Sequence, residues 1–263
     1  MHIVVCVKQV PNPEAAFSMF KVDEAAKRVV FAAGLQLVMS PFDEQAIEAA
    51  LRIREAHANT RITVISLGPE SARNAIKHGL AMGADDGVLI SDPLLENADG
   101  VVTARVLATA IQKLGEVDLV LAGRQSADRD AGIVGAGIAE RLGVPLVSYA
   151  QAVNVRDQIV RVERVLDEGT EVIEAALPAA VTVSNELGAP RTPNLRETMR
   201  AARKPVKLWK AADLALEDDA LRPRSTRVRL YIPEKQSRCE FLAGSAPEQA
   251  AALAKALHEA SLL

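Results

Sequence analysis

Residues 118–149, DLVLAGRQSADRDAGIVGAGIAERLGVPLVSY, contain the pattern that decides the fold. The short apolar run 119–122 ends at Gly123, where a polar segment begins; small residues and an apolar periodic stretch follow. Gly143 ends that stretch, and 146–149 again have the composition of a strand. This order of strand, loop, helix and strand predicts one unit of a parallel sheet.

The same alternation extends over the first 150 residues. Continuous β-branched and aliphatic runs predict buried parallel strands at 3–7, 61–67 and 87–90. Apolar residues at helical spacing predict helices at 41–54, 71–82 and 99–114. Ser40 and Ser71 are expected to cap the first two helices. The fold class expected is therefore α/β, with a doubly wound and mostly parallel sheet.

After Tyr149 the pattern changes to an alternation of polar and apolar residues, which predicts an antiparallel excursion. The strands expected there are 152–155, 159–165 and 170–175, followed by a buried strand at 179–183 and a short helix at 195–203. An earlier small hairpin is expected within 14–37.

The chain is expected to divide into a nucleotide-binding α/β domain, 1–205, and an extended C-terminal arm, 206–263. Prolines, acidic clusters and basic clusters interrupt the arm, and a final helix follows a Ser245–Glu248 capping box. Composition leaves open whether this arm packs on its own domain or on a partner.

Composition excludes several classes of function. The chain has 263 residues, 49% of them hydrophobic and 3% aromatic, with a net charge of -3 that disfavours a nucleic-acid partner. Cys6 and Cys239 have no spacing for a metal site or a disulfide framework, which suits a reducing compartment. The apolar run 3–7 is too short for a signal peptide or a membrane span. We therefore expect a cytoplasmic protein without membrane insertion.

A ligand site is expected where the loop after Gly123 meets the next helix, because ligands of open α/β sheets bind at the carboxyl ends of strands. The Ser126 hydroxyl and the amide groups of 131–134 could surround a phosphate without a lysine. Cys6 and the segment 40–43 are expected at the same edge. No Walker A motif or GxGxxG follows the first strand, and no histidine lies in a nucleophile motif. Binding is favoured over hydrolysis, with no catalytic or metal-ligating residue.

Several of these residues have a second interpretation. Gly132, Gly135 and Gly137 suit either close approach to a ligand or close packing of a helix on the sheet. Arg124 could supply charge to the site or lie in solvent. Asp128 and Asp130 could act in acid–base chemistry, but capping of the following helix or binding of ribose hydroxyls suits them better.

Five segments in order resemble one family: VCVKQVP, SPFDEQAIEAALRIRE, VISLGPESARNAIKHGLAMGADDGVLI, LVLAGRQSADRDAGIVGAGIAERLGVP and LPAAVTVSNELGAPRTPNLRETMRAARKPVKLW. They cover most of residues 1–210 and resemble the beta subunit of electron transfer flavoproteins. The tail RVRLYIPEKQSRCEFLAGSAPEQAAALAKALHE resembles the family's C-terminal arm.

The resemblance implies a heterodimer with an alpha subunit that carries most of the site for the redox-active FAD. The beta subunit would hold an adenine nucleotide, either AMP or, in electron-bifurcating members, a second FAD. The nucleotide contacts implied are Cys6, Ser40, Pro41, Phe42, Asp43, Leu67, Gly123, Arg124, Gln125, Ser126, Ala127, Asp128, Arg129, Asp130, Ala131, Gly132, Ile133 and Val134.

The resemblance also implies a docking segment, residues 190–199, in which Leu195 anchors a transient complex with a flavoprotein dehydrogenase such as an acyl-CoA dehydrogenase. Ser40 stands where the family often has Asn, and Asp43 where many AMP-binding members have Cys. The helix sequence VGAGIAERLGVP is nearer the bifurcating branch, whereas YIPEK also occurs in non-bifurcating members. AMP and a second FAD therefore both stay open. The alternative is a stand-alone nucleotide-binding regulatory protein of the stress-protein type, against which the arm argues.

Overall fold

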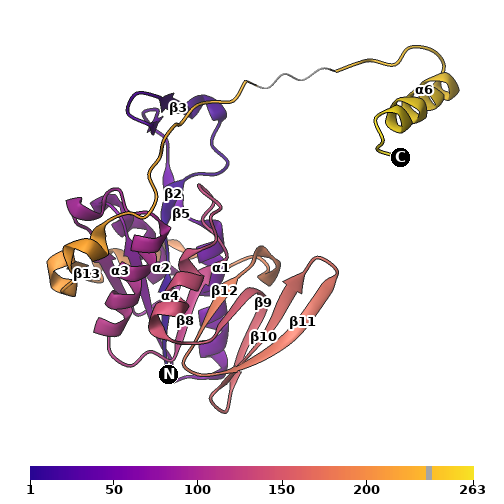
Figure 1. Cartoon of the computed structure of the whole chain (residues 1–263). Coiled ribbons are helices and arrows are strands. Elements are labelled where there is room, and N and C mark those ends of the chain that lie inside the picture. The colour runs from indigo at the N-terminus through magenta and orange to yellow at the C-terminus, as the bar shows by residue number, and fades with distance from the viewer. Residues whose placement is uncertain (235–238) are drawn as a thin grey trace. The chain divides into compact units, whose positions relative to one another are not determined.

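The computed structural model describes residues 1–234 and 239–263, in two compact units (Figure 1). The larger unit comprises Met1–Lys21 and Val29–Val228, and the smaller one Val22–Arg28 and Arg229–Leu263. Residues 235–238, which belong to the expected arm, lie outside the described residues.

The described residues form a nine-stranded sheet at the centre of the larger unit. Its order is β11 (Gly169–Ala176), β10 (Ile159–Leu166), β9 (Leu146–Arg156), β12 (Ala179–Val183), β8 (Leu119–Gly123), β1 (His2–Cys6), β6 (Arg61–Leu67), β7 (Asp86–Ile90) and β13 (Val206–Trp209). In this order, every neighbouring pair from β9–β12 through β7–β13 is parallel. The pairs β11–β10 and β10–β9 are antiparallel. The expected mostly parallel sheet with an antiparallel excursion is confirmed.

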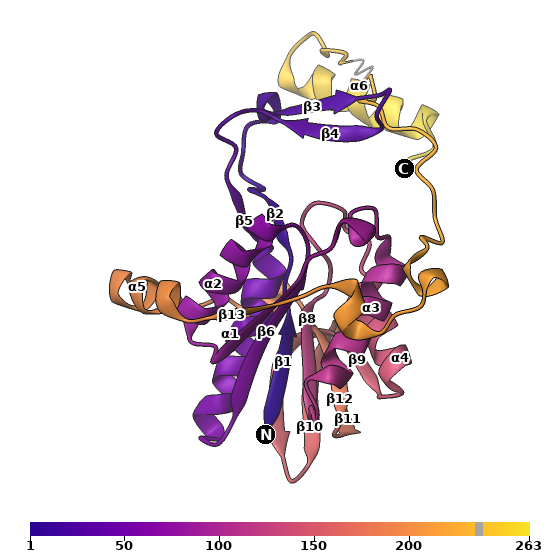
Figure 2. The ribbon, with the colours of Figure 1, turned by 90° about the vertical axis from the view of Figure 1, so that its left-hand side faces the viewer.

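Helices cover both faces of this sheet. Successive side chains of a strand point to opposite faces, so Ile3 and Val5 pack under α1 (Pro41–Ala56) and α2 (Arg73–Met82). Val4 instead packs in the cluster formed with α3 (Gly100–Lys113) and α4 (Val134–Leu142). Figure 2 shows the two helix layers on either side of β1. This two-sided burial explains why the parallel strands are continuous apolar runs.

The remaining elements are shorter. They are the antiparallel pair β2 (Gln9–Pro11) and β5 (Leu37–Met39), the hairpin β3 (Phe20–Asp23) and β4 (Arg28–Phe31), the helix α5 (Leu195–Arg203), the helix α6 (Ala246–Glu259) of the smaller unit, and the 3₁₀ turns Phe17–Met19, Glu70–Ala72, Pro93–Leu95, Asn185–Leu187, Ala211–Leu214 and Asp218–Leu221. The hairpin, the helix at 195–203 and the Ser245–Glu248 capping box agree with the sequence.

The structure corrects the expected strand boundary near Tyr149 and the expected cap of α2. The predicted strands 146–149 and 152–155 are one strand, β9, which continues through an irregularity near Tyr149, where φ is 60°. Ser71 does not cap α2, because it lies inside a 3₁₀ turn and donates its hydroxyl to Gln9 Oε1 at 2.8 Å. The helix begins only at Arg73.

The strand β13 belongs to the larger unit, which extends to Val228. The strand β13 pairs in parallel with β7, from Val206 opposite Gly87 to Trp209 opposite Ile90. It forms one edge of the sheet, and β11 forms the other.

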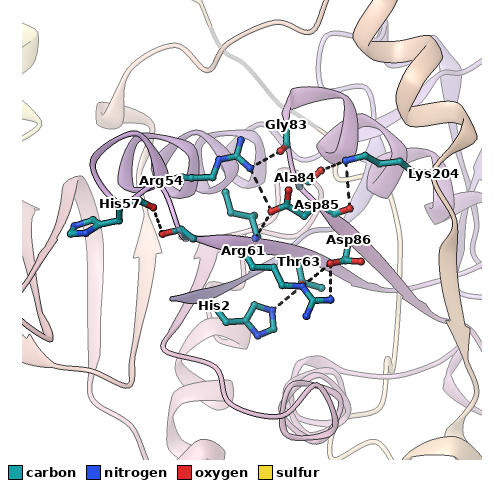
Figure 3. Close-up of polar contacts among 12 residues, drawn as sticks. His2, Arg54, His57, Arg61, Thr63, Gly83, Ala84, Asp85, Asp86 and Lys204 are labelled. Carbon is teal, nitrogen blue, oxygen red and sulfur yellow. Dashed lines mark hydrogen bonds and ion pairs between the residues drawn. The ribbon is translucent and has the colours of Figure 1, made fainter.

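Polar contacts tie the loops at the amino ends of the strands together (Figure 3). The Arg61 guanidinium lies 2.8 Å from Asp86, and the His2 ring lies 2.9 Å from the Thr63 hydroxyl. At the opposite edge, where the parallel strands end, the chain first continues from β1 to β6 and β7 on one side. It then crosses to β8 and later β12 on the other side of β1. The carboxyl ends of β1 and β8 therefore mark the switch point, where open α/β sheets bind ligands.

Candidate functional site

Asp43 joins the two strand ends at the switch point. It lies in the first turn of α1, and its Oδ2 accepts a hydrogen bond of 2.8 Å from the N–H of Lys8, just beyond β1. Its Oδ1 accepts a bond of 3.1 Å from the N–H of Gly123, the last residue of β8. One carboxylate thus fixes the start of a helix and the ends of two neighbouring strands.

Burial sets the protonation of this carboxyl. Desolvation raises the pKa of Asp43 to about 7, although the two backbone N–H groups and the charge of Lys8 lower it. Burial, and then the charge of Asp43, raise the pKa of the Cys6 thiol to about 12. Cys6 is therefore a neutral core residue at the end of β1, without the thiolate that reactivity needs.

Gly123 permits this close approach of helix and strand. A Cβ at position 123 would lie 2.5 Å from Asp43 Oδ1 and 2.6 Å from Phe42 Cβ. Gly135 and Gly137 have a packing role, since a Cβ there would lie 2.6 Å from Thr182 Cγ2 and 2.7 Å from Ala104 Cβ respectively. For these two glycines the packing interpretation is correct. Gly132 differs, because its φ of 63° lies in the left-handed region.

Lys8 contributes a positive charge to the loop, and this residue was not among the predicted site residues. Its ammonium lies 2.6 and 2.7 Å from the two carboxylate oxygens of Asp128 and 3.4 Å from the Ser126 hydroxyl. Desolvation opposes ionisation of Asp128, but Lys8 and the hydroxyl hold the pKa of that carboxyl below its usual value. The available signal was a lysine directly after a buried strand, in the segment VCVKQVP.

Arg124 is not in solvent, which corrects one of its two interpretations. Its guanidinium lies over the rings of Phe42 and Tyr149, with centroid distances of 5.1 and 5.8 Å, and donates to the Ser184 hydroxyl at 3.3 Å. Its buried Nε has no hydrogen-bond partner among the described residues. The Ser184 hydroxyl, and to a lesser degree the charge of Arg124, lower the pKa of Glu186. The first side chain of the loop therefore faces β9 and β12.

The rest of the loop folds on itself before α4. Gln125 donates to Asp130 Oδ1 at 3.0 Å, and the N–H of Asp130 donates to Ser126 O at 2.9 Å. The helix starts after Ile133, and no described side chain caps it. The interpretation of Asp128 and Asp130 as caps is therefore wrong. The amide groups of the first turn are left to an outside acceptor, which a helix N-terminus favours.

Ser40 occupies the cap position of α1, but its hydroxyl makes no capping bond and instead accepts the N–H of Ala127 at 3.4 Å. Hydrogen bonds and ring contacts thus bring segment 40–43 and the loop together at the end of β1. Leu67 ends the neighbouring β6 and packs against the hydrophobic cluster that contains Cys6. The expected site residues other than Leu195 thus lie along one edge of the sheet.

Comparison with known proteins identifies the family. A model described as "Electron transfer flavoprotein domain" matches residues 28–214. The chain is 38% identical to an electron transfer flavoprotein subunit beta of Megasphaera elsdenii, over 90% of this chain and 89% of that protein. It is 35% identical to the caffeyl-CoA reductase-Etf complex subunit CarD of Acetobacterium woodii, over 95% of both chains. The chain belongs to the electron transfer flavoprotein beta-subunit family.

Another similar member of this family is the protein FixA of Bradyrhizobium diazoefficiens, at 33% identity over 98% of this chain and 91% of that protein. The resemblance on which the sequence analysis relied is therefore confirmed. These matches extend over nearly the whole chain, so the loop after Gly123 and the segment around Leu195 both lie within the similarity.

Leu195, the expected docking residue of this family member, lies apart from the switch-point site. It is the first residue of α5, and 76% of its surface is exposed. Within residues 1–234 and 239–263, no helix has the length and apolar character needed to cross a membrane. The same residues contain no group of His, Cys, Asp and Glu that could hold a metal ion.

Proposed function

We propose that the chain is the beta subunit of a heterodimeric electron transfer flavoprotein. The heterodimer would carry electrons from a flavoprotein dehydrogenase, such as an acyl-CoA dehydrogenase, to a second acceptor. The alpha subunit would hold most of the site for the redox-active FAD. This chain would hold an adenine nucleotide, AMP or a second FAD, at the switch point. Support comes from the family membership and, above all, from Asp43, which holds two strand ends and α1 around that edge.

FAD, when bound, supplies the electron-transfer chemistry, and the residues of this chain bind and orient the nucleotide. The amide groups at the start of α4, the Ser126 hydroxyl and the Lys8 ammonium are suited to phosphate oxygens. Both oxygens of Asp43 already accept backbone N–H groups, and Asp128 is paired with Lys8. These two carboxylates are thus occupied by donors of the protein itself, which favours a binding role for the site over acid–base catalysis.

The smaller unit supports a partner-binding arm. No residue of α6 is buried, and the apolar side chains of Phe241 and Leu253 are exposed. Exposed apolar side chains gathered on one segment are typical of a surface that another protein covers. We propose the alpha subunit as that protein. The free thiols of Cys6 and Cys239 are compatible with the cytoplasmic location that we propose.

Cofactor content of the purified heterodimer tests this function. The chain co-expressed with its alpha subunit is expected to yield a yellow complex containing either one FAD and one AMP or two FAD. The first result identifies a simple carrier, and the second favours a bifurcating one. A well-folded monomer that binds ATP and co-purifies with no flavin-containing partner would contradict the proposal and favour a stand-alone regulatory protein.

Leu195→Ala is expected to slow electron transfer from the dehydrogenase while the flavin content stays intact. A buried apolar anchor at the centre of a small interface carries much of its binding energy, and truncation costs about 1–3 kcal/mol. The expected result is a KM for the dehydrogenase raised about tenfold or more. An unchanged KM would remove Leu195 from the docking segment.

A further inference from the structure

Arg191 fixes the amino-terminal end of the docking segment to α1. Its Nε and backbone N–H donate to Glu48 Oε2 at 2.7 and 3.2 Å, and its Nη2 donates to Glu48 Oε1 at 3.1 Å. The same guanidinium lies 2.9 Å from Glu55, about two helical turns further along α1. The Glu48 side chain is only 7% exposed. A forked guanidinium bonded in this way holds direction as well as position.

Further contacts from α1 hold the residues that precede Arg191. Gln45 donates to the carbonyl of Asn185 at 3.2 Å, and Arg52 donates to that of Leu187 at 3.1 Å. Desolvation opposes ionisation of Glu48, yet the bonds from Arg191 and Arg52 hold the pKa of that carboxyl below its usual value. The contact between Arg191 and Glu48, which we call the first clamp, is therefore an ion pair at neutral pH.

Lys77 of α2 holds the residues that directly follow the docking segment. Its ammonium donates to the carbonyls of Ala201 and Ala202 at 3.0 and 2.9 Å, and also to that of Lys204. These carbonyls end α5, where a cation also complements the helix dipole. Lys204 returns the contact by donating to the carbonyl of Ala84, just beyond α2, at 2.7 Å (Figure 3).

The contacts of Lys77 form the second clamp, and two apolar residues between the clamps are exposed. Asn194 and Glu197 form a capping box that sets the start of α5. Leu195 and Met199 follow with 76% and 55% of their surfaces exposed. We propose that Arg191 and Lys77 are positioning residues, one at the start of the docking segment and one just after its end, so that Leu195 meets the dehydrogenase in one orientation. This inference rests on the proposed function, which gives the segment its docking role.

The test uses the heterodimer with four variants of this chain. Arg191→Met and Lys77→Met keep an apolar stem but remove the charge, and Arg191→Lys keeps the charge but loses the fork. Arg61→Met is the matched control, since it removes an arginine–carboxylate contact of 2.8 Å at the amino edge of the sheet.

Two measurements are made on each complex: steady-state reduction by an acyl-CoA dehydrogenase that reduces the wild type, and amide hydrogen exchange across residues 190–199. A loosened segment must be ordered on docking. Arg191→Met and Lys77→Met are therefore expected to raise KM about tenfold, equivalent to about 1.4 kcal/mol, with kcat unchanged. Exchange in the segment should accelerate. Arg191→Lys should fall between wild type and Arg191→Met, and the control should match wild type.

The outcomes separate this inference from the docking role itself. If Leu195→Ala raises KM but the clamp variants keep wild-type KM and exchange, the clamps are refuted and the docking role stands. If Leu195→Ala leaves KM unchanged, the docking role fails, and the positioning role is overturned with it even where exchange accelerates. A KM that rises equally in Arg61→Met would also overturn the inference, because the effect would then not belong to the docking segment.

Discussion

Replacing Asp43 by alanine is expected to remove the nucleotide from the purified heterodimer. The substitution leaves the N–H groups of Lys8 and Gly123 without their acceptor, and each buried unpaired donor costs about 1–3 kcal/mol. Water can reach these N–H groups if α1 separates from the end of β8. This movement displaces segment 40–43 from the loop. The measurement is the adenine nucleotide released per heterodimer on denaturation.

Asp118→Ala provides the matched control for this result. Asp118 accepts the N–H of His2 at 2.7 Å, so it joins the same two strands at the opposite edge of the sheet. Its loss should lower stability without emptying the site. Equal nucleotide loss in both variants would mean that sheet stability, and not the Asp43 contact, governs retention.

The buried Asp43 carboxyl also gives stability a pH dependence. Its pKa rises from 3.8 to about 7 on folding, so between these values the folded state holds more protons than the unfolded state. Stability is therefore greatest below pH 4 for this group and falls as pH rises toward 7, by on the order of 4 kcal/mol. Asp43→Asn, which cannot ionise, should remove this slope. The measurement is the urea midpoint of unfolding at pH 5 and 7.5 for the wild type and for Asp43→Asn. An equal change of midpoint with pH in the two proteins would refute the role of Asp43.

Gly123→Ala is expected to have the second large effect. The new methyl group would lie 2.5 Å from Asp43 Oδ1 and 2.9 Å from the backbone carbon of Phe42. Backbone cannot yield as a flexible side chain can, so the first turn of α1 must move away from β8. Overpacking of this kind costs about 1–3 kcal/mol or more, and here the displacement falls on the proposed nucleotide site. The midpoint temperature of thermal unfolding and the nucleotide content per heterodimer should both decrease.

Gly68→Ala serves as the comparison for that substitution. Gly68 follows β6 at the same edge, but a Cβ there would meet only Ala72 Cβ, at 3.1 Å. A shift of a few tenths of an ångström accommodates it, so nucleotide content should stay at the wild-type level. If Gly123→Ala behaves in the same way, the close approach of α1 to β8 is not required for binding.

The fold could be predicted because its signals are local. Each parallel strand is buried on both faces, so it is a continuous apolar run, and each helix has an apolar stripe. The strand β13 was missed because four residues at a sheet edge, with Lys207 among them, have neither feature. The irregularity that joins the two halves of β9 was missed because a single residue, Tyr149, adopts a left-handed conformation there.

The location of the candidate site could be predicted, but its contacts could not. The topology rule placed the loop and segment 40–43 at one edge before any contact was known. The bonds of Asp43 span 35 and 80 residues, and the rings beside Arg124 come from positions 42 and 149. Such pairings depend on register across the sheet, which residue spacing along the chain does not encode.

The edge strand β13 ties the sheet to the beginning of the tail. A protease that cuts near residue 205 would remove the partner of β7 and uncover the backbone groups of Gly87–Ile90 along that edge. An open edge of this kind recruits other strands and promotes aggregation. A cut beyond Val228 would instead leave the sheet complete. The two cleavage products would therefore differ in solubility, although both have lost α6.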